Sequence, residues 1–464
     1  MTLDIIRVAY GVLLLATLGS TLPHARRYFL GERWGGYGER GWRVELVQNP
    51  VVMPLVLALW FGAAAGLIAG WHPVLCAAIN LACCHYFFIA MRWRSVLRGM
   101  GAPGFIAYWL GAAVFVLELT TRYAPPALAA LALSTVQIDF ALIMISAGIY
   151  KMVSGYRSGH GMELGMVNPE WGYAARWWSR WPPAHPLFRV LDEAAWATEV
   201  AGGVLMLVPQ TRMIGGIVIL LSFIFIATQI RLGFLCEMVV VCCLLFLPMT
   251  TTAAGRGAEM PAAIQTMLAA SFWTYLILLP VVRAALYYNQ LAHKALPPPL
   301  QRTLDAYANL FGLIIWRVFT ADVVDFFVRI WEQPVTGGAR RLVTDYGGFP
   351  GVNRFRQVAE CITITSVFTT LRYYAGNRQL FVDRVMRYAR TIRHEPGAGL
   401  VFEWVSVTPR DRFEWTPIAE YCVNVETGTV DETVLGDITS VRAPAAASPV
   451  HEGLRPGSYA PARR

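Results

Sequence analysis

Charged residues are scarce in this chain of 464 residues: they make up 15% of it, whereas soluble domains contain about a quarter. Hydrophobic residues make up 56% and are clustered rather than dispersed. Val51 to Trp71 contains no charge, and Pro73 to Met91 contains only His85 as a titratable residue besides cysteine and tyrosine. Each stretch is long enough to cross a bilayer, which takes about 20 apolar residues. The sequence therefore excludes a single soluble globule, a disordered chain and a secreted disulfide scaffold, and it predicts an integral membrane protein.

Lysine is nearly absent, since Lys151 and Lys294 are the only two among 39 basic residues. The arginines lie mostly in loops between apolar segments and form no patch interleaved with aromatic residues. We therefore attribute the net charge of +9 to membrane topology and expect no nucleic-acid partner. Because lysine can lose its proton and arginine cannot, each lysine is a candidate for acid–base chemistry.

Metal-site spacing and a cleavable signal peptide are also missing. Six of the eight cysteines lie inside apolar segments, and the adjacent pairs Cys83-Cys84 and Cys242-Cys243 point in different directions on a helix. We read the cysteines as small buried hydrophobic residues and expect no bound metal. Met1 to Asp4 carries no basic residue, so the first apolar stretch is expected to be a retained helix.

The apolar stretches predict a bundle of about nine transmembrane helices, which makes the chain mainly α. They cover residues 3–21, 51–71, 73–91, 103–120, 126–150, 188–208, 212–231, 233–249 and 264–288. Alternating these helices across a membrane collects most of the arginines on one side, in the loops near Arg26, Arg92, Lys151 and Arg231. The other side receives only Arg122, Arg212 and Arg256. The asymmetry predicts that the first side faces the cytoplasm.

After Tyr288 the composition changes, and Pro297 to Pro299 end the helical pattern. From about Asn309 the chain is charged and strand-like, and we expect a small α+β domain. Strands are predicted at 326–331, 400–407 and 420–425, and an amphipathic helix at 379–393. The expected organisation is a membrane domain over residues 1–295, an α+β domain over 296–442 and a disordered tail over 443–464, rich in Ala, Pro, Gly and Ser.

The loop between Lys151 and Arg189 is too polar to span a membrane, yet it contains four tryptophans. We expect Trp171, Trp177, Trp178 and Trp181 to form an interfacial belt, with a stacking site for a flat cofactor as the alternative. Lys151 closes an apolar helix. It either extends toward lipid headgroups, as lysines at helix ends do, or sits in an apolar pocket that favours the neutral amine and lets it act as a general base.

The residues around Lys151 resemble the signature of vitamin K-dependent gamma-carboxylases and their bacterial relatives, the horizontally transferred transmembrane domain (HTTM) family. The run Ala147-Gly148-Ile149-Tyr150-Lys151-Met152 is followed by Tyr156, Gly159, Met162 and Glu163. That family carries Ala-Gly-x-x-Lys-Leu and then Trp, Gly, Met and Glu at matching spacing. Arg7 to Gly11, His85 and Trp316 to Phe319 resemble further family positions.

The resemblance implies a membrane-embedded carboxylase that uses a reduced quinone of the vitamin K or menaquinone type. In that family a neutral lysine deprotonates the quinol, oxygen adds to the ring, and the strong base produced removes a proton from a glutamate γ-carbon, which then takes up carbon dioxide. By resemblance, Lys151 is the catalytic base and His85 positions carbon dioxide or the product. The substrate, a protein or peptide in the animal enzymes, stays open for this chain.

Several other polar residues are expected at membrane depth, where charges are costly and usually paired. They are Glu118, Asp139, Asp192, Glu193, Glu199, Arg231 and Glu237. We expect Glu199 and Arg231 to form an ion pair, and Asp139 to meet a partner on another helix. His160 is either a site residue or an exposed loop residue.

Two other functional classes stay open. The first is a non-catalytic membrane subunit that scaffolds lipid or a partner membrane protein, in which Lys151 only reaches the headgroups. The second is a small-molecule transporter, which the intramembrane carboxylates alone suggest. In every case the expected location is a bacterial inner membrane, crossed several times.

Overall fold

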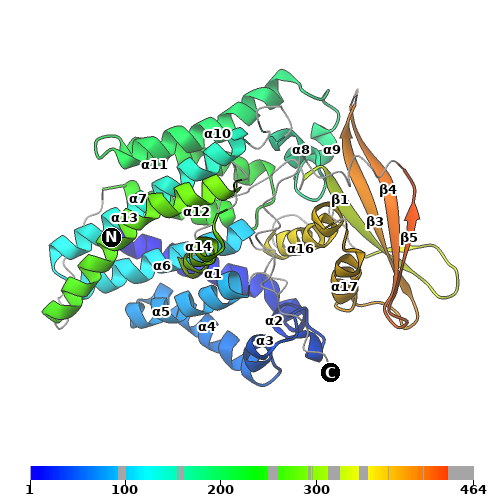
Figure 1. Cartoon of the computed structure of the whole chain (residues 1–464), viewed down its shortest axis with the longest axis horizontal. Coiled ribbons are helices and arrows are strands. Elements are labelled where there is room, and N and C mark those ends of the chain that lie inside the picture. Colours follow the sequence, from blue (N-terminus) through cyan, green and yellow to red (C-terminus); the bar gives the residue numbers. More distant parts are fainter. Residues whose placement is uncertain are drawn as a thin grey trace.

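The computed structural model describes residues 2–91, 101–153, 156, 161–248, 260–290, 294, 296–311, 324–343, 354–374, 376–410 and 412–436. The fold is mainly helical, with a small antiparallel sheet near the C-terminus. The long helices lie side by side in a bundle, and the sheet lies beyond one end of it with two helices in between (Figure 1).

All nine apolar stretches contain a helix, as predicted. These are α1 (Thr2–Thr21), α4 (Val52–Ala69), α5 (Pro73–Cys84) with η3 (His85–Ala90), α6 (Gly101–Tyr123), α7 (Pro126–Val153), α10 (Pro186–Leu207), α11 (Arg212–Gln229), α12 (Leu235–Cys243) with η6 (Leu244–Phe246), and α13 (Ala262–Gln290). Among the described residues, seven are long and apolar enough to cross a membrane. The other two are α10, which carries several charges, and the short α12. The number of membrane crossings therefore stays a prediction.

Local signals explain where the helices begin and end. The Asn49 side chain accepts hydrogen bonds from the backbone N–H groups of Val51 and Val52, at 3.0 and 2.9 Å, and so caps the start of α4. The same helix ends at Gly70, whose φ of +71° is the left-handed conformation that glycine adopts readily. Pro126 occupies the first position of α7, where its missing N–H costs nothing.

Glycines let α10 pack closely between α7 and α11. A Cβ atom on Gly148 of α7 would lie 2.7 Å from the carbonyl oxygen of Trp196 on α10. A Cβ atom on Gly215 of α11 would lie 2.5 Å from the carbonyl oxygen of Gly202 on α10. Backbone contact of this kind accompanies the burial of Asp192 and Glu199 on α10, whereas Arg189 and Glu193 of the same helix are exposed.

The two ends of the bundle differ in charge. The N-terminus lies at the end far from the sheet (Figure 1), where Thr2 donates a hydrogen bond to the carbonyl of Pro248. At the same end the N–H of Met260 bonds to the carbonyl of Tyr123. Helix direction alternates along the chain, so the arginine-rich connections from α1 to α4 and from α7 to α10 lie at the sheet end. The predicted grouping of arginines at one end thus holds for the described residues.

The sheet is built from five antiparallel strands in the order β2-β1-β3-β4-β5. The strands are β1 (Phe326–Gln333), β2 (Arg341–Leu342), β3 (Gly399–Pro409), β4 (Phe413–Asn424) and β5 (Thr429–Val434). The three predicted strands are confirmed as β1, β3 and β4, and the predicted amphipathic helix is confirmed as α17 (Arg378–Ala389). The small α+β fold was therefore predicted correctly.

The expectation of strand-like structure from Asn309 onward was wrong for residues 354–373, and a helix that begins before Asn309 was not predicted. Residues 298–311 form α14 (Pro298–Phe311) and residues 354–373 form α16 (Arg354–Tyr373). In α16 the β-branched residues Ile362 to Thr365 favour a strand by propensity, but Phe368 packs against Phe402 and Trp404 of the sheet. Burial against the sheet thus overrides local preference.

α14 follows the expected domain boundary at residue 295 but packs with the long helices. Leu304 and Ala308 of α14 form an apolar cluster with Tyr150 of α7 and Leu279 of α13. The Tyr108 hydroxyl on α6 also donates to the carbonyl of Leu310. Trp316 to Phe319 and the predicted tail, residues 443–464, lie outside the described residues.

The C-terminal unit is attached to the bundle through a partly buried carboxylate, Glu360 on α16. Arg27 on α2 (Ala25–Phe29) reaches it at 2.5 Å, and the hydroxyls of Tyr28 and Tyr388 donate to it at 2.9 and 2.6 Å. Asn168 makes a second attachment by donating to the carbonyls of Val324 and Phe326, both at 2.8 Å. The unit is therefore fixed to the same end of the bundle at which α7 ends.

Candidate functional site at Lys151

Lys151 lies in the last turn of α7, and the structure buries it. The residue is 3% exposed, and its Nζ lies 2.5 Å from Oε1 of Glu199 on α10. The ring of Tyr156 lies 5.8 Å from the same nitrogen. Both members of the pair are held in place by the close packing of α7 on α10 at Gly148, one turn before Lys151. A buried, short ion pair between two helices results.

Two carboxylates near the Lys151–Glu199 pair accept hydrogen bonds from backbone N–H groups of the connection between α7 and α10. Asp192 on α10 accepts from the N–H of Met162, at 2.7 Å, at the start of α8 (Gly161–Val167). Glu163 on α8 accepts from the N–H of Ala184, also at 2.7 Å. These bonds fold the connection back over the end of α7, and α8 is buried along its whole length. The Lys151–Glu199 pair is thereby covered by protein rather than by water.

The structure excludes one of the two alternatives for Lys151, and one expectation about this region was wrong. Lys151 does not extend toward headgroups, because it points into the bundle and is bonded to Glu199. Glu199 does not pair with Arg231, which instead donates to the carbonyl of Pro169 at 2.8 Å and stacks on Tyr173. Arg231 therefore stabilises the connection between α8 and α9 (Ala175–Trp178) rather than a charge on α10.

Glu199 retains an unused acceptor. Its second oxygen, Oε2, is buried and receives no hydrogen bond from any described residue. A buried carboxylate oxygen without a donor is costly, which makes it a candidate acceptor for a ligand hydroxyl. A quinol needs such an acceptor, a group that can take its proton and an apolar or aromatic surface. Glu199, Lys151 and the Tyr156 ring supply this set, so the described residues fit a phenolic hydroxyl.

His85, the second predicted catalytic residue, has different surroundings. It is the first residue of η3 and packs against the ring of Tyr108 on α6, with centroids 5.6 Å apart. Its Nε2 is buried and makes no hydrogen bond within the described part of the chain. No described contact joins His85 to Lys151, so the structure does not bring the two predicted residues together. His160 lies outside the described residues.

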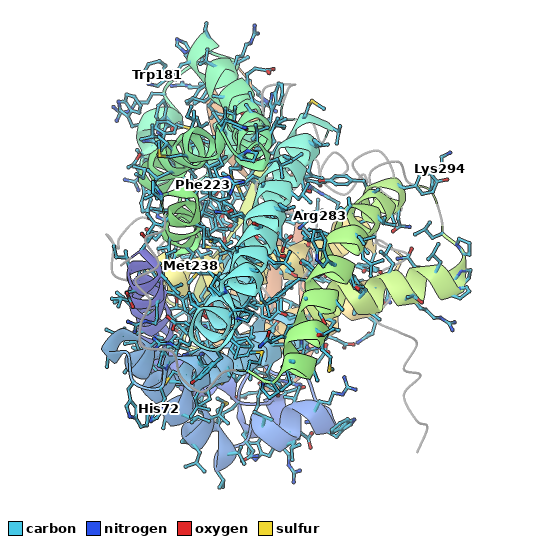
Figure 2. The ribbon with its side chains drawn as sticks, turned by 90° about the vertical axis from the view of Figure 1, so that its left-hand side faces the viewer. His72, Trp181, Phe223, Met238, Arg283 and Lys294 are labelled. Carbon is cyan, nitrogen blue, oxygen red and sulfur yellow. The ribbon has the colours of Figure 1, made fainter. Side chains whose placement is uncertain are left out.

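Two other predicted intramembrane carboxylates, Asp139 and Glu118, hold helices together. Asp139 on α7 accepts from Arg283 on α13 at 2.9 Å and from Trp109 and Tyr275 at 2.8 Å each. Figure 2 shows Arg283 on α13 beside α7. The carboxylate is thus shared by three helices, as predicted for Asp139, and each of its oxygens has a donor.

Glu118 on α6 plays a similar part near the far end of the bundle. It lies 3.2 Å from Arg7 on α1 and 2.9 Å from Arg122 on its own helix. Arg7 also donates to the carbonyl of Leu67 on α4. These contacts fit helix packing rather than a reaction.

The tryptophans of the connection do not form a simple belt. Trp171 and Trp178 are buried within the protein, which contradicts the belt for these two, whereas Trp177 is 48% exposed. Trp177, Trp178 and Trp181 pack against one another with centroids 4.3 to 5.9 Å apart. Figure 2 shows Trp181 at the outer edge of the bundle. An interfacial role therefore remains for Trp177 and Trp181.

Sequence reasoning found Lys151 and Glu199 but did not pair them. The sequence did indicate that each residue needs a partner, because a charge buried in one apolar helix is usually paired with an opposite charge on another helix. It did not indicate that α7 and α10 are neighbours, since this depends on how the small residues of the two helices pack. Compared with known proteins, the chain matches no family model, no curated protein and no solved structure.

Proposed function

We propose that this chain is a multi-pass membrane enzyme in which Lys151 and Glu199 form the proton-transfer centre. The observation that carries the proposal is the buried Lys151–Glu199 pair with an acceptor left over on Glu199. Ionisable groups at membrane depth are costly and mark functional sites more often than not. The helices long and apolar enough to span support the membrane location, which we place in the bacterial inner membrane.

We further propose that the reaction resembles that of vitamin K-dependent gamma-carboxylases, with a reduced quinone as cofactor and an unidentified acceptor, either a peptide or a smaller molecule. When bound, the quinol supplies, with oxygen, the strong base needed to remove a weakly acidic proton. Lys151 is the base that starts the reaction. We do not carry His85 into this centre, because its described contacts lie elsewhere.

The geometry suggests how Lys151 becomes a base. A proton that moves from Nζ to Oε1 of Glu199 along the 2.5 Å contact leaves a neutral amine beside a neutral carboxylic acid. The amine can then accept a proton from a bound hydroxyl. The positive charge gained by the Lys151–Glu199 pair balances the negative charge left on the deprotonated hydroxyl. The covering by α8 keeps out water that would protonate a reactive anion again.

The test uses the whole chain purified in lipid with reduced menaquinone or reduced vitamin K. Oxygen uptake and quinone epoxide are measured for the wild type, Lys151→Ala and Glu199→Gln. We expect epoxide from the wild type and a loss of about 100-fold or more in both variants, the usual contribution of a general base. Lys294→Arg, which changes the only other lysine, is the control.

A folded wild-type sample that forms no epoxide with either quinol would contradict the proposal. The pair would then be a structural contact, as in the alternative of a non-catalytic membrane subunit that scaffolds lipid or a partner protein.

A further inference from the structure

Three arginines from two segments that are far apart in the chain meet in a hollow between α9 and the sheet. The hollow has a volume of about 460 Å³ and is lined by Arg176, Ser179, Arg180, Arg412, Phe413 and Trp415. Arg176 and Arg180 belong to α9 and the turn after it, and Arg412 belongs to the hairpin between β3 and β4. The α9 segment and the hairpin are brought together by Phe188 of α10, which packs on Trp178 and on Phe413.

Among the described residues, these arginines have no ion-pair partner of the kind that other arginines on this surface have. Arg410, two residues before Arg412, lies 3.6 Å from Glu414, and Arg340 reaches Glu420 at 2.6 Å. No described carboxylate forms an ion pair with Arg176, Arg180 or Arg412, and all three are exposed. Three like charges around one hollow repel each other, so the arrangement favours a negatively charged ligand.

The chemistry of the lining narrows the class of ligand. Arginine guanidinium groups match phosphate oxygens with paired hydrogen bonds, and the Ser179 hydroxyl adds a further polar group. Phe413 and Trp415 give the same hollow an apolar wall. Trp177, which follows Arg176 in α9, is exposed, and its ring is of the type that favours the headgroup region of a membrane.

We propose that this hollow binds a phosphate group, carried by an anionic phospholipid or present as free phosphate. The site lies at the sheet end of the bundle, to which α7 and α10 bring Lys151 and Glu199. Its occupation would hold the α9 segment and the hairpin together across a ligand. The proposal does not depend on quinol chemistry, because the hollow shares no residue with the Lys151–Glu199 pair.

The test measures binding of short-chain phosphatidylglycerol to the whole detergent-purified chain, with phosphatidylcholine as the uncharged comparison. The test variant combines Arg176→Gln, Arg180→Gln and Arg412→Gln. The control combines Arg33→Gln, Arg40→Gln and Arg302→Gln, which removes the same charge from exposed arginines elsewhere. Elution volume and melting temperature must match the wild type, and single Arg412→Gln replaces the test variant if it misfolds.

We expect the test variant to lose about 100-fold in affinity for phosphatidylglycerol, since each arginine near an anionic headgroup contributes about fivefold. The control should bind like the wild type. If inorganic phosphate displaces phosphatidylglycerol, free phosphate is a sufficient ligand. If it does not, the ligand is the lipid headgroup. Equal losses in the test and control variants, or equal binding of both lipids by the wild type, would overturn the proposal.

Discussion

Lys151 and Glu199 depend on each other for their burial. In Lys151→Met the carboxylate of Glu199 loses its only described donor, and removing one partner of a buried pair costs about 3–5 kcal/mol. In the double variant Lys151→Met with Glu199→Leu both charges are gone, so we expect most of this stability to return. The measurement is thermal unfolding of each variant in the same detergent.

The matched control for this comparison is Lys294→Met, because Lys294 is exposed. Lys294→Met should have the same melting temperature as the wild type. A Lys151→Met protein that is as stable as the wild type would contradict the burial of the pair.

Chemistry alone singled out individual residues, and the catalytic role of Lys151 stays a prediction. Lys151 stood out because the chain has only two lysines, and Asp139 met a partner on another helix as predicted. The partner of Glu199 was predicted wrongly as Arg231, because either cation satisfies a carboxylate and only three-dimensional packing chooses between them.

At the scale of elements, the close approach of α7 and α10 determines the site. Gly148→Ala would place a Cβ atom 2.7 Å from the Trp196 carbonyl, so the helices must separate. We expect a loss of about 1–3 kcal/mol and a weaker Lys151–Glu199 contact. Gly62→Ala on α4 is the control, because no atom lies within 4 Å of the new methyl group and alanine favours a helix by about 1 kcal/mol. Equal melting temperatures for the two variants would contradict the packing described here.

The sheet carries a pH-dependent contact at Glu332 on β1. The N–H of Glu395 donates to its carboxylate at 2.6 Å and Arg341 pairs with it, and these bonds lower the pKa of Glu332 below its usual value of 4.5. A lowered pKa stabilises the fold above about pH 4.5, and this stability is lost as the pH falls through the folded-state pKa. We expect Glu332→Gln to melt lower at pH 7 and to depend less on pH in the acid range.

Melting temperatures of the wild type and Glu332→Gln between pH 3 and pH 7 give the measurement. Parallel acid profiles for the two proteins would show that Glu332 does not contribute.

Elements were predicted best where one signal dominated. The nine apolar stretches became helices because hydrophobic length leaves few alternatives. α16 was missed because its β-branched residues resemble a strand, and α14 because Pro297 to Pro299 were read only as the end of a helix, although proline is also common in the first turn of a helix. Both helices owe their stability to partners distant in sequence, which local patterns do not show.

The whole molecule combines a helical bundle with a C-terminal sheet on the same end as Lys151 (Figure 1). Glu360 and Asn168 connect the two parts at points far apart in the chain. This arrangement places the proposed proton-transfer pair beneath the α8 connection, at the end of the bundle to which the C-terminal unit is attached. None of these long-range contacts follows from composition or periodicity. The sequence therefore predicted the individual helices and strands better than the way they pack together.

We propose that Lys151 acts through its proton and not only through its charge. Lys151→Arg separates the two, because arginine can still pair with Glu199 but does not give up its proton. In one lipid preparation, melting temperature, oxygen uptake and quinone epoxide are measured for Lys151→Arg and for Lys294→Arg. We expect both variants to melt at the wild-type temperature, and we expect only Lys151→Arg to lose oxygen uptake and epoxide formation. Epoxide formation at the wild-type rate by Lys151→Arg would contradict this proposal.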